Sequence, residues 1–190
     1  MDLVYGQPLK ELLQISSYFK EQLIVLVKTE VSEKAAKQAE QIPCYLVDES
    51  TDLNKIKNKK KAVLGGSIKN NEFAVKINAD YLLQPSNEKQ FFDLGLAKKL
   101  ADNNTTVVLM FEELLDKNSF ERHQFWKNYM EVVYYCKKKG TKFFVASGNK
   151  EPLNLKHPKV RQNLAQLLGL DEVNAKKYLD GVALKWKLKK

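Results

Sequence analysis

Short apolar runs alternate with longer segments of helical periodicity along the 190 residues of the chain. The run Leu23-Ile24-Val25-Leu26-Val27 is apolar at every position, which is typical of a parallel strand buried on both faces. Further short runs, some rich in β-branched residues, predict strands in the same way. These predicted strands span residues 1–5, 44–47, 62–66, 80–83, 105–110 and 142–146.

Helices are predicted between these strands, wherever apolar residues recur three and four positions apart. The longest covers 119–139, with Phe125, Tyr129 and Val132 on its expected buried side and Gly140 as its C-terminal cap. The other predicted helices span 9–18, 31–41, 70–77, 87–101, 158–168 and 171–179. Strands that alternate with helices predict a parallel α/β architecture.

Periodicity does not decide between an open doubly wound sheet and a closed barrel. A complete (β/α)₈ barrel typically needs about 250 residues. A barrel of 190 residues would therefore be trimmed or distorted.

The chain carries a formal net charge of +9, and its basic residues are almost all lysine, with Arg122 and Arg161 as the arginines. A cationic domain favours anionic partners, with nucleic acid first and a membrane surface second. Lysine acts as a point charge on phosphate, so the composition indicates backbone binding more than base reading. The alternative, codon bias in an AT-rich genome, explains the excess lysine equally well.

The basic residues form four clusters along the sequence. The tail alternates lysine with apolar residues, a pattern that can bind a phosphate backbone but that also fits a frayed, solubilising terminus. The clusters are Lys55 to Lys61; Lys137, Lys138, Lys139 and Lys142; Lys150, Lys156, Lys159 and Arg161; and the tail from Lys185 to Lys190.

Phosphate-binding and catalytic signatures are weak in this sequence. Gly65-Gly66-Ser67 follows a predicted strand and could hold a phosphate on backbone N–H groups, but GxGxxG and GxxxxGK[ST] motifs are absent, so a tight turn is the favoured interpretation. Carboxylates at strand ends could bind magnesium, but they lack a defined spacing and fit solvated loops better. They are Asp48, Glu49, Glu112 and Glu113.

The cysteines and histidines do not complete a metal site. Cys44 and Cys136 form no CxxC pair, and each is interpreted as a small buried hydrophobe. The two histidines are too few for a multi-histidine centre; His123 is expected at the surface and His157 at the start of a helix. We therefore expect no catalytic residue and no metal or cofactor bound by the protein.

The sequence has neither a run of eighteen apolar residues nor a basic and apolar leader after Met1. A transmembrane helix and a secretory signal are therefore not expected. We expect a soluble, cytoplasmic protein with no membrane partner.

Four segments, in order, resemble the archaeal and eukaryotic ribonuclease P protein component 3 family, the thirty-kilodalton subunit. The last is the most specific: Val145-Ala146-Ser147-Gly148, Lys156-His157-Pro158 and then Leu167 to Glu172 match the family's closing Ser-Gly, Leu-Arg-Ser-Pro and Leu-Gly-hydrophobic pattern. The likeness spans roughly residues 1 to 180 and is weak before residue 60. The earlier segments are Ala62 to Gly66, Ala79 to Pro85 and Phe92 to Leu115.

The resemblance implies a single TIM-barrel-like domain over 1–180, followed by a basic tail over 181–190. It implies an RNA-binding subunit of ribonuclease P, the ribonucleoprotein that removes 5′ leaders from precursor tRNA. In this family the RNA performs the catalysis with Mg²⁺, and the protein pairs with a Pop5-type subunit. Expected partners are therefore the ribonuclease P RNA, precursor tRNA and the Pop5-type protein.

Two departures from the family pattern affect the expected contacts. Lysine replaces the family's arginine at Lys156, which keeps the charge but loses the bidentate fork, and Asn71 is followed by Glu72 where the family often has arginine. We nevertheless expect phosphate contacts from basic residues near the glycine pair and the closing motif. The expected RNA-binding residues are Lys69, Lys150, Lys156, Lys159 and Arg161.

Two alternatives come from other classes of protein. A diverged metal-dependent phosphoesterase of the polymerase and histidinol phosphatase superfamily would have a related barrel, but it needs a His-x-His pair where this chain has Tyr5-Gly6-Gln7. A scaffold protein with purely solubilising lysines is the other alternative. Salt-dependent RNA affinity would distinguish it from an RNA-binding subunit.

Overall fold

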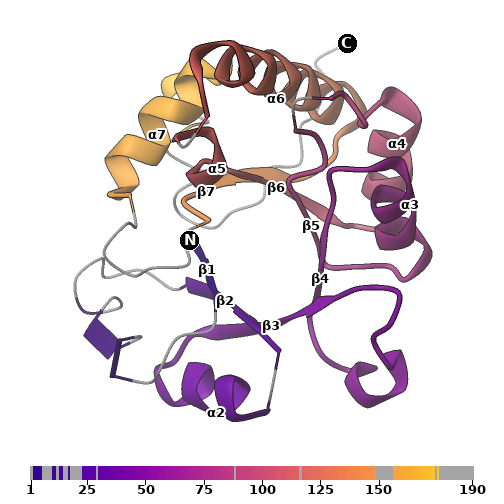
Figure 1. Ribbon diagram of the computed structural model, residues 1–190, viewed down its shortest axis with the longest axis vertical. Helices are drawn as coiled ribbons and strands as arrows, with labels where there is room; N and C mark the ends of the chain where they lie inside the picture. The colour runs from indigo at the N-terminus through magenta and orange to yellow at the C-terminus, as the bar shows by residue number, and fades with distance from the viewer. Residues whose placement is uncertain are drawn as a thin grey trace.

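Seven parallel strands form one sheet in which the spatial order equals the sequence order (Figure 1). The computed structural model describes residues 2–5, 10–11, 13–14, 17, 23–28, 30–87, 89–115, 117–148, 156–173 and 175. Each predicted strand is confirmed. The strands are β1 (Asp2–Tyr5), β2 (Leu23–Val27), β3 (Ile42–Val47), β4 (Lys61–Leu64), β5 (Tyr81–Leu83), β6 (Thr106–Met110) and β7 (Phe143–Ala146).

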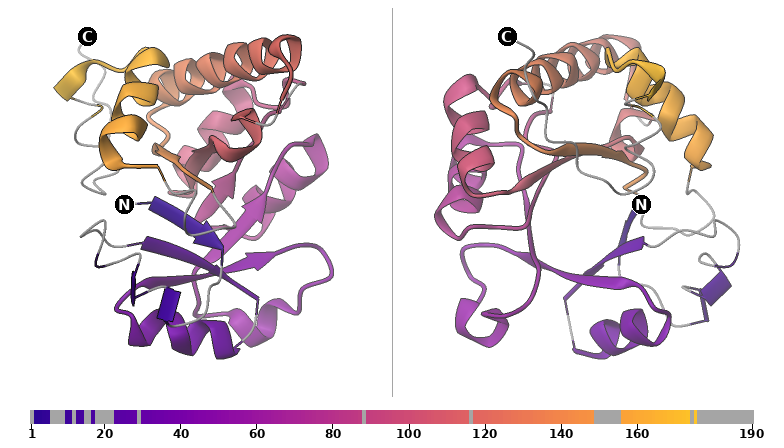
Figure 2. Two further views of the ribbon diagram at one scale, coloured as in Figure 1. Left: turned by 60° about the vertical axis from the view of Figure 1, so that its left-hand side comes forward. Right: turned by 180° about the vertical axis from the view of Figure 1, so that it is seen from behind.

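The sheet curls until its two outer strands, β1 and β7, contact each other, and the helices lie outside the ring (Figures 1 and 2). This arrangement is TIM-barrel-like with seven strands, which confirms the trimmed α/β barrel. The helices are α2 (Glu30–Gln38), α3 (Ile68–Lys76), α4 (Leu94–Asp102), α5 (Glu112–Leu115), α6 (Ser119–Lys139) and α7 (Pro158–Leu167). None of the helices in the described ranges is long and apolar enough to span a membrane.

The register shows why the strands are apolar on both faces. On β2, Leu23, Val25 and Val27 pack outward against α2, while the residues between them face the barrel interior. Inside the barrel the rings of Tyr81 and Phe144 meet edge to face, 6.4 Å between centroids, from two strands that flank β6. Side chains therefore fill the ring, as in TIM barrels in general, and polar groups are left to the two ends of the strands.

Several helix boundaries differ from the predictions because capping side chains decide them. The predicted helix 87–101 begins at Leu94, where the Asp93 carboxylate accepts from the Leu96 N–H. The helix predicted from residue 70 begins at Ile68 behind the cap Ser67. The long helix begins as predicted at Ser119, but Asn118 caps it.

Two short elements were not predicted. Helix α5 follows β6 directly, and a 3₁₀ turn (Leu53–Ile56) buries Ile56 within the basic cluster Lys55 to Lys61. The predicted helices 9–18 and 171–179 lie largely outside the described residues, and the tail 181–190 lies wholly outside them.

The carboxylate of Glu33 joins α2, β3 and the lysine-rich loop. Buried on α2, it accepts from the Tyr45 hydroxyl at 2.5 Å and pairs with Lys37 at 2.5 Å and Lys59 at 2.6 Å. Hydrogen bonds from Lys37, Lys59 and Tyr45 lower the pKa of Glu33 from its usual value near 4.5 to about 2, against an opposing effect of burial. Lys59, a member of the basic cluster Lys55 to Lys61, therefore stabilises the fold.

This cluster predicts a loss of stability in acid. A depressed folded-state pKa gives stability that is complete above the unfolded pKa near 4.5 and is lost as pH falls from there toward about 2. The contribution at neutral pH is on the order of 3 kcal/mol. The free energy of unfolding, measured with urea at pH 7, 4 and 3, should fall more steeply with decreasing pH for the native chain than for Glu33→Gln. Parallel curves for the two proteins would contradict the assignment.

Candidate nucleic-acid interface

The carboxyl ends of the seven strands form one end of the barrel, called here the carboxyl rim. At β4 the rim is built by Gly65-Gly66-Ser67. A Cβ on Gly65 would lie 2.5 Å from Asn71 Oδ1 and 2.8 Å from Pro85 Cα. The buried Asn71 amide donates to the carbonyl oxygens of Pro85, at 2.8 Å, and Phe91, at 2.9 Å. The glycine pair thus allows α3 to approach the segment after β5, so close packing explains it without a bound phosphate.

Lys69, an expected RNA contact, lies in the first turn of α3 at this rim. Its amine pairs with Glu49 at 2.5 Å, and about three quarters of its side chain remains exposed. An incoming phosphate would therefore have to replace Glu49.

The connection from β7 to α7 holds Lys156 by both of its backbone polar groups. The Lys156 N–H donates to Ser147 Oγ at 2.9 Å, and its carbonyl oxygen accepts from Arg161 Nε at 3.3 Å. His157 caps α7, as predicted, by accepting from the Lys159 N–H at its Nδ1. Pro158 then begins the helix at a position where no N–H is needed.

Two lysines of this connection present cations to solvent. The Lys159 side chain is exposed and that of Lys156 is half-buried, and neither amine has an ion-pair partner within the described ranges. Other lysines are engaged in ion pairs: Lys37 and Lys59 with Glu33, and Lys69 with Glu49. Unpaired cations beside a fixed turn are suited to bind an anion.

Arg161 differs from its neighbours because it is only 1% exposed. This burial does not fit the direct phosphate contact expected of Arg161, because its guanidinium lies beneath the Lys156 turn. Lys150, another expected contact, lies outside the described residues. The structure thus gathers Lys156, Lys159 and Arg161 in one turn, whereas β5 and β6 lie between that turn and Lys69.

Ser147 was part of the closing sequence motif but was not predicted as a site residue. It is buried, and its hydroxyl is the acceptor that fixes Lys156. The available signal was the Ser-Gly pair directly after the last strand, at the end of a barrel where functional groups gather.

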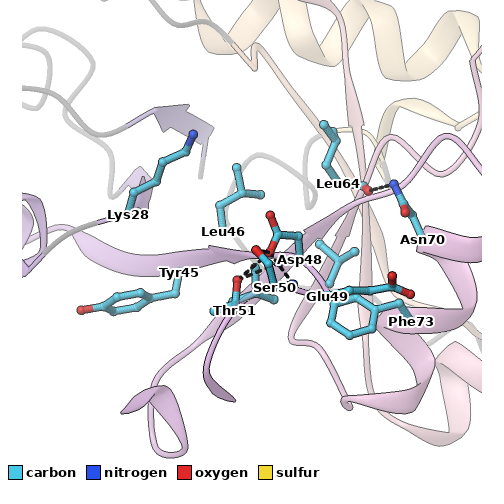
Figure 3. A pocket seen from close by; sticks show the side chains of 12 residues that line it. Lys28, Tyr45, Leu46, Asp48, Glu49, Ser50, Thr51, Leu64, Asn70 and Phe73 are labelled. Atoms are coloured by element: carbon cyan, nitrogen blue, oxygen red, sulfur yellow. Dashed lines mark hydrogen bonds between the residues drawn. The ribbon is translucent and has the colours of Figure 1, made fainter. Parts of the chain in front are cut away.

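A pocket of about 470 Å³ opens on the carboxyl rim at the ends of β2, β3 and β4 (Figure 3). Its carboxylates are engaged: Asp48 accepts from the hydroxyls of Ser50 and Thr51, which lowers the pKa of Asp48, and Glu49 binds Lys69. The lining residues are Lys28, Tyr45, Leu46, Val47, Asp48, Glu49, Ser50, Thr51, Val63, Leu64, Asn70 and Phe73.

The described histidines, cysteines and carboxylates form neither a metal cluster nor an activated thiol. Within the described ranges no three His, Cys, Asp or Glu residues are close enough to share a metal ion. Cys44 and Cys136 are fully buried, and burial raises the pKa of both thiols, so they are poor nucleophiles. The chemistry that these residues support at the rim is electrostatic binding.

Fold and site together define an α/β barrel protein with exposed cations on its carboxyl rim. The model of one family, RNase P subunit p30, matches residues 22–186. That match covers most of the sequence, so the chain belongs to the RNase P subunit p30 family and is a protein subunit of ribonuclease P.

Solved structures agree with this fold. A chain of "archaeal Ribonuclease P with mature tRNA", determined by cryo-EM, is similar with a TM-score of 0.75 and 17% identity, over 94% of this chain and 86% of the other. The crystal structure of an uncharacterized protein is similar with a TM-score of 0.50 and 9% identity, over 98% of this chain and 57% of the other. No curated protein has significant similarity to the sequence.

Two glycines with a left-handed backbone, Gly148 after β7 and Gly169 after α7, should differ in how much stability an alanine substitution costs. Gly148 and Gly169 have φ values of +74° and +88°, but a Cβ would lie 2.7 Å from Met110 Cβ at Gly148 and meets nothing within 4 Å at Gly169. Alanine at either position costs about 1 kcal/mol through the left-handed backbone, and Gly148→Ala adds about 2 kcal/mol of overpacking. Urea unfolding of Gly148→Ala and Gly169→Ala measures both costs, and equal costs would contradict the close approach to Met110.

Proposed function

We propose that this chain binds RNA within ribonuclease P and supports the RNA-catalysed removal of 5′ leaders from precursor tRNA. The observation that carries the proposal is the Lys156 turn, where two lysines without an ion-pair partner among the described residues project from a backbone held by Ser147 and Arg161. A fixed cation loses less entropy on binding phosphate than a lysine on a mobile loop. Family membership and the similarity to a chain of archaeal ribonuclease P support the same role.

Each basic residue has a stated part in the proposal. Lys156 and Lys159 contact phosphates directly, and Lys150 adds a contact from the same connection. Lys69 contacts phosphate after exchanging Glu49 for the RNA. Arg161 positions the Lys156 turn from beneath, since its Nε donates to the Lys156 carbonyl and its side chain is buried.

The protein itself provides no catalytic group in this proposal. The RNA holds the Mg²⁺ ions that activate water. The lysines of the barrel reduce the repulsion between phosphates when the ribonuclease P RNA folds and when it binds precursor tRNA. The partners are the ribonuclease P RNA, precursor tRNA and a Pop5-type subunit, and the compartment is the cytoplasm.

Neutralising the two direct contacts should change the salt dependence of RNA binding. Each phosphate contact contributes close to one unit to the slope of log affinity against log salt. Lys156→Gln with Lys159→Gln should therefore weaken binding to ribonuclease P RNA and reduce the slope by about two. Filter binding or fluorescence anisotropy between 50 and 400 mM salt gives the slope.

The matched control is Lys76→Gln with Lys99→Gln, which removes the same charge from exposed positions on α3 and α4. If both double variants reduce the slope equally, net charge acts without a defined contact. An unchanged slope in Lys156→Gln with Lys159→Gln would place the RNA surface elsewhere.

Reconstituted cleavage of precursor tRNA tests the function as a whole. Adding the chain to the ribonuclease P RNA, its other protein subunits and Mg²⁺ should raise the cleavage rate or lower the Mg²⁺ required. The chain alone should cleave nothing. Hydrolysis of a phosphoester by the chain alone, with no effect on the RNA, would instead identify a diverged phosphoesterase.

A further inference from the structure

Helix α6 carries apolar residues on both of its faces. Its inner face packs against the barrel through Phe125, Tyr129 and Val132. Its outer face exposes three large apolar side chains: Phe120 is 73% exposed, Met130 46% and Tyr134 56%. Single exposed apolar residues are common, but a row of them along one helix marks an interaction surface.

These residues belong to one row with a regular spacing, called here the α6 stripe. The stripe consists of Phe120, His123, Lys127, Met130, Tyr134 and Lys138, all exposed. Successive members are three or four positions apart, which places them on one side of the helix. Phe120 and Tyr134 are fourteen positions apart, so the apolar part of the stripe is about 21 Å long.

The charge of the stripe is positive because the two acidic residues of α6 are outside it and are engaged elsewhere. Glu121 accepts from the Asn118 N–H at 3.3 Å in the helix cap, and Glu131 accepts from the Gln90 amide at 2.9 Å. Lys138 lies over the Tyr134 ring, 5.6 Å from its centroid, and Lys127 is exposed between the apolar residues. The stripe is therefore apolar and cationic, with no acidic member.

We propose that the α6 stripe binds an amphipathic helix of a partner protein that carries acidic residues along its apolar face. Spacings of three and four match the way one helix packs along another. Acidic residues on the partner would pair with Lys127 and Lys138, while its apolar residues cover Phe120, Met130 and Tyr134. Such pairing selects the partner and its orientation.

The same observations disfavour the other occupants. RNA affinity depends on neutralising many phosphates, and the stripe offers only two lysines and one histidine over its length. A second copy of the chain would bring the same cations together, at a net charge of +9 per chain. The inference rests on the proposed function, in which the chain works beside other protein subunits.

Site-selective thiol labelling tests the proposal in the assembled enzyme. Cys44 and Cys136 are buried, so a maleimide should label an introduced exposed cysteine selectively. Met130→Cys reports on the stripe without changing its charge, and Val160→Cys reports on the Lys156 turn. The two sites are matched, at 46% and 44% exposure. Labelling rates are measured for the free chain, with the ribonuclease P RNA alone, and with the other protein subunits alone.

We expect the protein subunits to slow labelling at Met130→Cys at least tenfold, and the RNA alone to leave it unchanged. Protection by the RNA alone would overturn the proposal and make the stripe an RNA surface. Labelling that nothing slows would also overturn it. Val160→Cys tests the proposed function separately from the stripe. If the RNA does not slow labelling at Val160→Cys, RNA binding at the Lys156 turn is contradicted, and the result at Met130→Cys still tests the stripe.

A second pair of variants measures the energy of the contact. Phe120→Ser with Tyr134→Ser should weaken binding to the protein subunits at least tenfold and leave affinity for the RNA alone unchanged. Ile68→Ser with Leu167→Ser is the control, since both residues are more than 60% exposed but lie on other helices. Circular dichroism establishes that both double variants are folded. Equal binding by the two would contradict the assignment of the stripe.

Discussion

The complete burial of strands β2, β5, β6 and β7 is the constraint from which the rest of the structure follows. One face packs against the helices and the other fills the barrel, as the outward Leu23 and Val25 and the inward Tyr81 and Phe144 show. A polar side chain in the middle of a strand would lose hydration without a partner. Charged groups are therefore excluded from the middle of these strands, and binding chemistry must be built at the two ends of the barrel or on its helices.

The Lys156 turn shows how such an end is made rigid. Ser147 ends the last strand and accepts the Lys156 N–H, while Arg161 reaches back from α7 to the Lys156 carbonyl. Burying a guanidinium is expensive unless its donors are satisfied, so Arg161 fixes the geometry of the acceptors around it. The exposed lysines of the turn then start from a defined backbone. Rigidity and charge come from different residues, and this explains why the single buried arginine lies among surface lysines.

The sequence predicted the strands well because two-sided burial leaves a continuous apolar run, as in β2. Helix 119–139 was equally clear, since a buried face of large side chains and a C-terminal glycine define it. The start of α4 was missed because the helical periodicity continues upstream of Asp93, and only its cap ends the preceding loop. Hydrophobic periodicity carries no information about a side chain, such as Asp93, that accepts a hydrogen bond from the backbone.

The candidate site was harder to predict because charge alone does not show exposure. The closing motif pointed to the Lys156 turn, yet Arg161 and Lys159, two positions apart, differ completely in burial. The pairings of Lys69 with Glu49 and of Lys59 with Glu33 join residues distant in sequence, so they depend on the tertiary fold. Ser147 was overlooked for the same reason, since its partner lies nine residues away across the connection.

The distribution of cations separates two kinds of surface on one barrel. Lysines that project from a polar, fixed turn can neutralise phosphate but offer no apolar area, so their binding should weaken steeply with salt. On α6, lysines alternate with the apolar side chains of Phe120, Met130 and Tyr134. The burial of this apolar area contributes binding energy that salt does not screen. A subunit that joins both RNA and a partner protein, as proposed above, needs both kinds of surface. Their location on separate elements, the β7–α7 connection and the outer face of α6, allows both partners to bind at once.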